Sequence, residues 1–211
     1  MCVVLSYTAP PLSERGRDLS SAGVEEDLQK GQTDLVSDLP GFYPDLQPPT
    51  ERVALAQRLD FCRSAAVARI YDLDDERASR QPLPATNLTV GGVVRHLAWA
   101  EDRWFVGKLR GLPLPEPWRS APMADQPDWP FESSRDDAVA DVVALYREAC
   151  QRSREAAGRY DSPDAVAAVV SFGRSPVTLR WLLVHVIEET AWHLGHLDLL
   201  RDGLGAPPAA P

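Results

Sequence analysis

From about residue 50 onward, apolar positions recur at intervals of three or four, and proline- and glycine-rich stretches interrupt them. This spacing places apolar side chains on one face of an α-helix. Four segments of the chain carry the pattern, and they predict helices over residues 50–71, 89–109, 134–160 and 177–202. Four long amphipathic helices with one long crossover connection predict an all-α four-helix bundle.

Residues at the ends of these segments support the boundaries. Threonine and serine side chains cap helix N-termini well, whereas glycine and proline end helices. The candidate N-caps are Thr50, Thr86 or Thr89, and Ser133 or Ser134. The candidate stops are Gly111 with Pro113, Gly158 with Pro163, and Gly203.

The connections between the helices differ in character. Residues 73–83 read as a polar connector, and residues 166–172 (VAAVVSF) could form a short strand or an extended turn. Residues 113–132 form a proline-rich loop that carries Trp118, Trp129 and Phe131. Long loops of this kind are often functional. Two interpretations remain open: a surface strap anchored by its aromatic residues, or a wall or lid over a site.

Outside the helical part, low apolar content and many prolines predict an N-terminal arm over residues 1–48, disordered or extended. The four-helix bundle is expected over residues 49–203, and residues 204–211 are expected to form a flexible tail.

Composition excludes several functional classes. The net charge is −9 and the pI about 4.9, which argues against nucleic acid as a partner and weakly against anionic membranes. The three cysteines lie far apart and form neither a disulfide framework nor a zinc ribbon. No apolar run is long enough for a transmembrane helix, and the first residues lack a basic signal-peptide region. We therefore expect a cytoplasmic protein.

The predicted last helix carries three of the four histidines in the chain. At 100° per residue, Glu189, His193 and His196 lie about 40°, 80° and 20° from His185 around the helix axis. Three imidazoles and one carboxylate therefore share one narrow stripe. Because the helix is apolar around much of its circumference, we expect it to be mostly buried.

The fourth histidine, His96, lies on the apolar face of the predicted second helix, between Val93 and Ala100. Buried histidine and glutamate side chains must be hydrogen-bonded, paired with a charge or bound to a metal. Satisfied core histidines beside a salt-bridged glutamate are one interpretation. The combination of imidazole and carboxylate groups on one stripe favours the other, a divalent-metal site.

The sequences RHLAWAEDRW around His96 and ETAWHLGH from Glu189 resemble the DinB-like superfamily of metal-binding four-helix bundles. The resemblance covers about residues 50–203. Many members use one histidine on the second helix and a histidine pair spaced i, i+4 on the fourth. In the branch of mycothiol-dependent maleylpyruvate isomerases and related thiol S-transferases, glutamate replaces the first histidine of the pair, as Glu189 does here.

The resemblance implies that His96, Glu189 and His193 bind a divalent metal ion, zinc first, with nickel or another transition metal as alternatives. His185 and His196 could replace a ligand, hold one in position or move a proton. We take His196 as the first choice for an accessory acid or base, and His185 as a residue that positions a ligand.

Two histidines and one carboxylate leave a metal ion with an open position, which is typical of catalytic sites. A thiol bound there would be deprotonated. The resemblance implies a low-molecular-weight thiol such as mycothiol, and an S-transferase or isomerase that acts on a small-molecule electrophile. Arg95 and Arg180 are candidate anchors for a substrate carboxylate; solvated charges at helix ends are the alternative for both.

Two other functions remain open. The same site could activate water, which would make the protein a metal-dependent hydrolase. The chain could also be a non-enzymatic helical bundle, with or without a structural ion, that acts as a homodimer.

Overall fold

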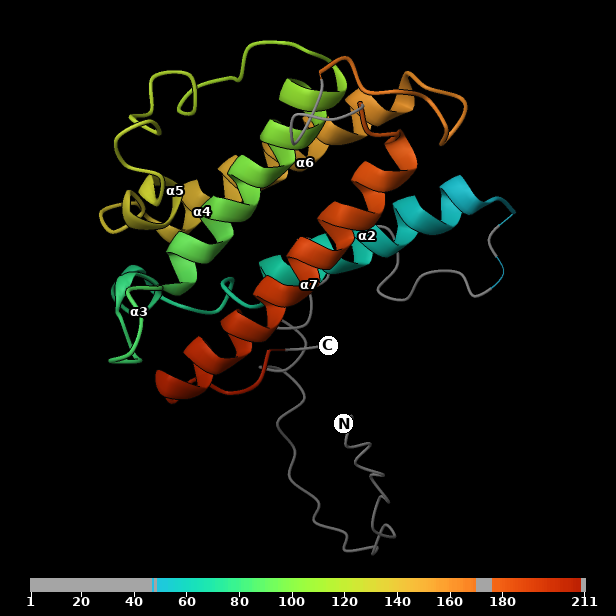
Figure 1. The fold of residues 1–211 in the computed structure, drawn as a ribbon. Helices are drawn as coiled ribbons and strands as arrows, with labels where there is room; N and C mark the ends of the chain where they lie inside the picture. The colour runs from blue at the N-terminus through green and yellow to red at the C-terminus, as the bar shows by residue number, and fades with distance from the viewer. Residues whose placement is uncertain (1–46, 48, 170–175, 210–211) are drawn as a thin grey trace, which may run out of the picture. The chain divides into compact units, whose positions relative to one another are not determined.

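The computed structural model describes residues 47, 49–169 and 176–209. Four long helical segments, shown in Figure 1, make up most of this part: α2 (Glu51–Ala68), α4 (Val90–Glu101) continued by η1 (Asp102–Leu109), α6 (Val139–Gly158) and α7 (Leu179–Gly203). Two short helices, α3 (Asp75–Ser79) and α5 (Trp129–Glu132), lie in the connectors. The prediction of an all-α bundle is confirmed.

Three predictions fall wholly or partly outside the described residues, and the tail predicted over residues 204–211 is one of them, described as far as residue 209. Of the predicted arm over residues 1–48, the structure describes residue 47 alone. The segment over residues 166–172, predicted as a short strand or an extended turn, is described as far as residue 169. Within that stretch, Val166 makes an isolated antiparallel bridge with Thr178, so an extended turn is what the described residues form.

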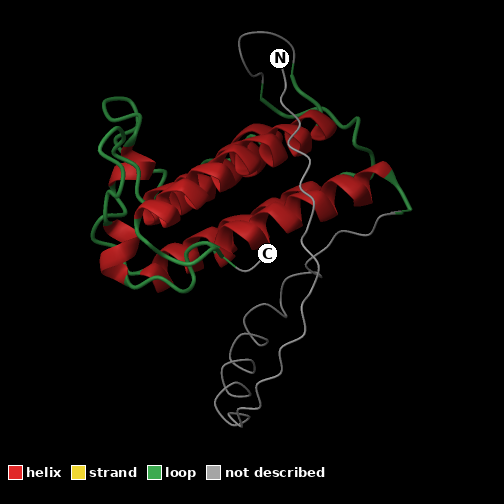
Figure 2. Ribbon diagram, turned by 90° about the horizontal axis from the view of Figure 1, so that it is seen from below, coloured by secondary structure: helices red, strands yellow, loops and turns green. Residues whose placement is uncertain are grey.

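Packing within the bundle joins helices that are distant in sequence. Helix α4 packs against α6, α2 packs against α7, and α4 also packs against α7. The long helices run alongside one another, as Figure 2 shows from below. Nearly all of α4 is buried, which makes it the central helix. The contact between α4 and α7 matters most here, since these helices carry all four histidines.

Threonine side chains begin three of the long helices. The hydroxyl of Thr50 accepts a hydrogen bond from the backbone N–H of Val53, and the hydroxyl of Thr89 accepts one from Gly92. Thr178 caps α7 in the same way. Each cap satisfies one of the backbone donors that a helix start leaves unpaired. The predicted cap at Thr50 is confirmed, and Thr89 rather than Thr86 caps α4.

The third long helix starts later than predicted. Neither Ser133 nor Ser134 caps it; α6 begins at Val139, five residues after the predicted start at Ser134. The cap comes from another part of the chain, because the backbone N–H of Val139 donates to Asp75 Oδ1 at 2.8 Å. Asp137 is paired with Arg95 on α4. A cap supplied by α3 leaves no signal in the local sequence.

The second long helix changes type half-way. After Glu101, α4 continues as the π-helix η1, in which the Arg110 N–H donates to the Phe105 carbonyl five residues earlier. Asp102 begins this segment fully buried and accepts hydrogen bonds from Arg152 and from the indole N–H of Trp118. Gly111 ends it with φ +64°, a conformation that glycine adopts without strain. Such π-helical turns are frequent at functional sites.

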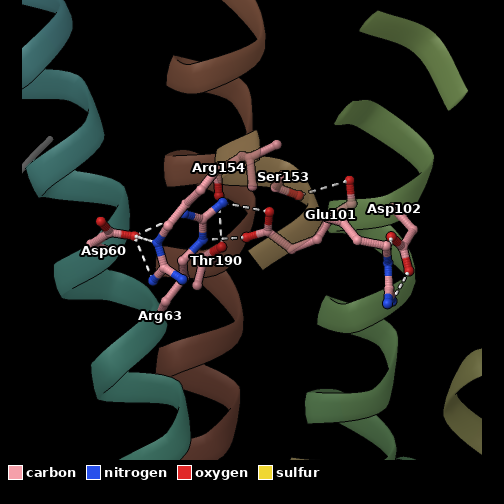
Figure 3. A network of polar contacts seen from close by, with 9 residues as sticks. Asp60, Arg63, Glu101, Asp102, Ser153, Arg154 and Thr190 are labelled. Atoms are coloured by element: carbon pink, nitrogen blue, oxygen red, sulfur yellow. Dashed lines mark hydrogen bonds and ion pairs between the residues drawn. The ribbon is translucent and has the colours of Figure 1, made fainter. Parts of the chain in front are cut away.

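A polar network crosses the middle of the bundle (Figure 3). Arg63 on α2 donates two hydrogen bonds, of 2.7 and 2.6 Å, to the two carboxylate oxygens of Glu101 on α4. Both side chains are buried. Asp60 accepts a hydrogen bond from Arg63 and another from Arg154 on α6. The network ties α2, α4 and α6 together through charge rather than apolar contact.

Helix α7 is less buried than predicted. Its inner face is buried, but large apolar side chains on the outer face are exposed, with Trp192 at 65% and Leu199 at 60%. The prediction of a mostly buried helix is therefore wrong, because apolar residues alone do not show which face has a partner. Within the described residues, no helix is both long enough and apolar enough to cross a membrane.

Candidate metal centre

Helix α4 brings His96 to the face of α7. The imidazole is buried, with 8% exposed, and its Nε2 lies 3.3 Å from Glu189 Oε1. Its other nitrogen, Nδ1, has no hydrogen-bond partner within the described residues. A buried polar atom without a partner is costly, so the side chain is suited to an additional ligand.

Glu189 and His193 lie one turn apart on α7, and both side chains are half-buried. The rings of His193 and His96 have centroids 4.7 Å apart. Each of the three residues offers one ligand atom such that these atoms all lie within 4.8 Å of one another. Two imidazoles and one carboxylate at this separation form a donor set that suits zinc and similar transition metals.

Electrostatics favour the metal-binding protonation states. Burial acts to raise the pKa of Glu189, but contacts from His185 and His96 outweigh it and bring the pKa well below its ordinary value. The pKa of His193 is lowered to about 4, chiefly by burial and also by the neighbouring His96 and His196. At neutral pH, Glu189 is therefore anionic and His193 is neutral, which are the forms that bind a metal ion.

The remaining histidines each contact one of these α7 residues. His185 Nε2 lies 3.4 Å from Glu189 Oε2, although Glu189 Oε2 has no hydrogen bond of good geometry among the described residues. His196 is exposed, and its Nδ1 lies 3.3 Å from Nδ1 of His193. The structure thus brings all four histidines and Glu189 into one cluster, with His96 at its buried side.

His185 lies among aromatic rings. Trp181 is stacked on it, with ring centroids 4.8 Å apart and planes inclined by 13°. Trp104, from η1, meets the same imidazole edge-on at 4.6 Å. These contacts restrict rotation of the ring and hold its Nε2 toward Glu189.

The proline-rich connector over residues 113–132 packs across the bundle and also borders the histidine cluster. Trp118 and Trp129 hold it in place, because the Arg95 guanidinium lies over both rings, 5.5 and 5.1 Å from their centroids. Phe131 follows two residues after Trp129 and lies flat on His96, with ring centroids 4.0 Å apart. It also lies 5.9 Å from the His193 ring. Trp118 and Trp129 therefore anchor the loop as a surface strap, and Phe131 forms a wall of the site.

A family model described as mycothiol S-transferase matches residues 54–205. The chain belongs to the mycothiol S-transferase family. This family lies within the DinB-like superfamily, so the resemblance drawn from His96, Glu189 and His193 is confirmed at the level of the superfamily. No curated protein matches the chain. Family membership points to mycothiol-related S-transferase activity, with a thiol as one substrate.

In this mycothiol S-transferase family member, the two arginines considered as carboxylate anchors are already paired. Arg180 contacts Glu51 and Asp164. Arg95 pairs with Asp137 in addition to its two tryptophan contacts. Both guanidinium groups therefore take part in ion pairs that hold separate parts of the fold together.

Sequence reasoning missed the aromatic side chains that the end of α4 and the start of η1 add to the cluster. Trp99 and Trp104 are five residues apart, a spacing that a regular α-helix does not bring to one face. The i→i+5 hydrogen bonding of a π-helix accommodates this spacing. The pair WAEDRW (residues 99–104) was visible in the sequence, but its meaning depends on a helix type that the sequence pattern does not predict.

Proposed function

We propose that the chain is a metal-dependent S-transferase that joins a low-molecular-weight thiol, mycothiol in this family, to a small electrophile. His96, Glu189 and His193 are the proposed ligands. The observation that carries the proposal is their convergence, with ligand atoms within 4.8 Å of one another and two of the three side chains half-buried rather than sealed. Zinc is the proposed ion, because the donor set of two imidazoles and one carboxylate is common in catalytic zinc sites.

A divalent ion held by these residues supplies the positive charge that keeps a bound thiol deprotonated at neutral pH. Neither of the two thiols in the described part of the chain suits the role. Cys62 and Cys150 are buried, and burial is the main cause that raises the pKa of each. The nucleophilic sulfur therefore comes from the cosubstrate.

The protein residues position the reactants and remove a proton. We assign proton removal to His196, because its exposed imidazole contacts His193 and can pass a proton to solvent. His185 holds Glu189 in place from the aromatic side of the cluster. Phe131 covers His96 and keeps water from that side. The sulfur then forms a bond to the electrophilic carbon, while the leaving group departs with its electron pair.

The first experiment is elemental analysis of the purified protein together with Glu189→Gln and Glu188→Gln. Glu188 is a matched control, since it is the adjacent carboxylate and is exposed. We expect an equimolar metal content in the wild type and in Glu188→Gln, and its loss in Glu189→Gln. Absence of metal from the wild type after incubation with zinc, nickel and cobalt would refute the proposal.

The second experiment measures conjugation of mycothiol to 1-chloro-2,4-dinitrobenzene in the same three proteins. We expect thiol-dependent formation of the conjugate in the wild type and in Glu188→Gln, and its loss in Glu189→Gln and after chelation. Chelator-sensitive hydrolysis of ester substrates without any thiol would instead indicate a hydrolase on the same site.

A further inference from the structure

Arg103 combines two features: no carboxylate within the described part of the chain pairs with it, and its guanidinium lies over two tryptophan rings. It lies in η1 with its side chain half-buried. Its guanidinium carbon lies 4.7 Å from the centroid of the Trp99 ring and 5.4 Å from that of Trp104. Cation–π contacts of this kind hold a guanidinium in place and leave its N–H donors free to bind a ligand.

Three other arginines of the bundle have a different environment. Arg63, Arg95 and Arg152 each form an ion pair with a carboxylate of another helix or loop. No salt bridge among the described residues includes Arg103.

Two series of contacts connect Arg103 to the candidate metal centre. On one side, Trp99 lies 5.4 Å from His96 between ring centroids. On the other side, Trp104 contacts His185, which lies 3.4 Å from Glu189. Since Glu189 and His96 are themselves 3.3 Å apart, the side chains form a closed ring. Arg103 therefore lies at the edge of the centre, opposite Glu189 around this ring.

The chemistry of the ring indicates one class of ligand. A guanidinium binds a carboxylate through two parallel hydrogen bonds, and tryptophan rings favour flat, conjugated groups. The chain as a whole carries a charge of −9, so an anionic substrate needs a local positive charge to approach. We propose that Arg103 binds the carboxylate of a planar, conjugated electrophile and thereby sets the substrate class; this rests on the proposed function.

Binding of two matched probes tests this assignment without any turnover. The probes are 3,5-dinitrobenzoate and 1,3-dinitrobenzene, which differ by the carboxylate, titrated against zinc-loaded protein by quenching of tryptophan fluorescence. We expect the wild type to bind the benzoate more tightly. Arg103→Gln should weaken benzoate binding by about tenfold to a hundredfold, the range for a lost hydrogen bond to a charged group, and leave dinitrobenzene binding unchanged.

Two further variants keep the test decisive. Arg110→Gln removes a charge at the end of the same helical segment and should change neither affinity. Arg103→Lys keeps the charge but not the forked geometry, so its benzoate affinity should fall between those of the wild type and Arg103→Gln. If Arg103→Gln does not fold, the benzoate affinity of Arg103→Lys tests the assignment in its place. Equal affinity of the wild type for both probes, or an unchanged preference in Arg103→Gln and Arg103→Lys, would overturn the assignment.

Turnover assays distinguish a failure of the Arg103 assignment from a failure of the proposed S-transferase function. With mycothiol and 4-chloro-3,5-dinitrobenzoate, a sulfur–carbon bond forms, chloride leaves with the bonding electrons and the thiol proton passes to solvent. We expect kcat/KM for this substrate to fall in Arg103→Gln, and kcat/KM for neutral 1-chloro-2,4-dinitrobenzene to stay the same. Arg103-dependent binding without conjugation would refute the S-transferase alone. Conjugation with no Arg103-dependent preference would refute the assignment of Arg103 alone.

Discussion

The ring of Phe131 lies parallel to the imidazole of His96, with centroids 4.0 Å apart and planes inclined by 11°. This relationship joins a loop residue to the one candidate ligand outside α7. His96 Nδ1 has no hydrogen-bond partner among the described residues that could fix the ring. The stacked phenyl ring therefore restrains the orientation of His96 in addition to the 3.3 Å contact between its Nε2 and Glu189 Oε1.

Replacement of Phe131 by leucine should loosen His96 without exposing it. Leucine keeps the apolar character but lacks a flat face, so the imidazole gains rotational freedom. We expect zinc affinity to fall by about tenfold, the lower end of what residues that orient metal ligands contribute. Titration against a chromophoric chelator measures the change. Phe131→Tyr keeps the ring and should bind zinc as the wild type does; equal losses in both variants would contradict the stacking argument.

Gly92 controls how closely the loop approaches α4. A Cβ atom at this position would lie 2.4 Å from the carbonyl oxygen of Phe131, whereas one at Gly91 would lie 3.3 Å from that of Ala78. Gly92→Ala should therefore displace the loop and cost about 1–3 kcal/mol of unfolding free energy, with weaker zinc binding as a second effect. Urea denaturation measures the stability. Gly91→Ala, the matched control, should be tolerated much better, and equal stability of the two variants would exclude this contact as the cause.

The buried pair of Arg63 and Glu101 predicts a large loss of stability when one partner is removed. Glu101→Gln leaves the Arg63 charge in the core with weaker compensation. We expect a loss of about 3–5 kcal/mol in unfolding free energy, as for other broken buried pairs. The control is Glu51→Gln, which breaks the exposed pair with Arg180 and should have little effect because solvent screens that pair.

The buried cysteines should be unreactive in the folded protein. Desolvation by burial is the largest cause that raises the pKa of Cys62 and Cys150, so little thiolate exists at pH 8. In a Cys2→Ser variant, we expect both thiols to react slowly with Ellman's reagent under native conditions and rapidly in denaturant. Fast reaction of either thiol in the native protein would instead support that cysteine as the nucleophile.

Much of this fold follows from short-range rules. The caps at Thr50 and Thr89 depend on hydrogen bonds within one turn, and the stripe of His185, Glu189 and His193 depends on helical periodicity alone. The sequence pattern therefore predicted the helices and grouped the α7 residues correctly. It also placed His96 on an inward face, which the structure confirms.

The features that could not be predicted depend on contacts between distant segments. Asp75 caps α6 from another helix, so the serines before that helix misled the prediction of its start. The outer face of α7 also carries large apolar residues, so apolar content could not separate it from the inner face. Arg95 and Arg180 appeared available because their partners, Asp137 and Glu51, lie far from them in the sequence.

The candidate ligands come from α4 and α7, which meet only when the bundle has formed. An unfolded chain would hold no such site, so an ion that binds here must stabilise the native state by mass action. At a free-ion concentration 100 times the dissociation constant, this gain is about 2.7 kcal/mol. The melting temperature of metal-free protein, measured against a panel of divalent ions, should therefore rank them by affinity. The thermal stability of the bundle would then identify the ion that binds most tightly, before any substrate is known.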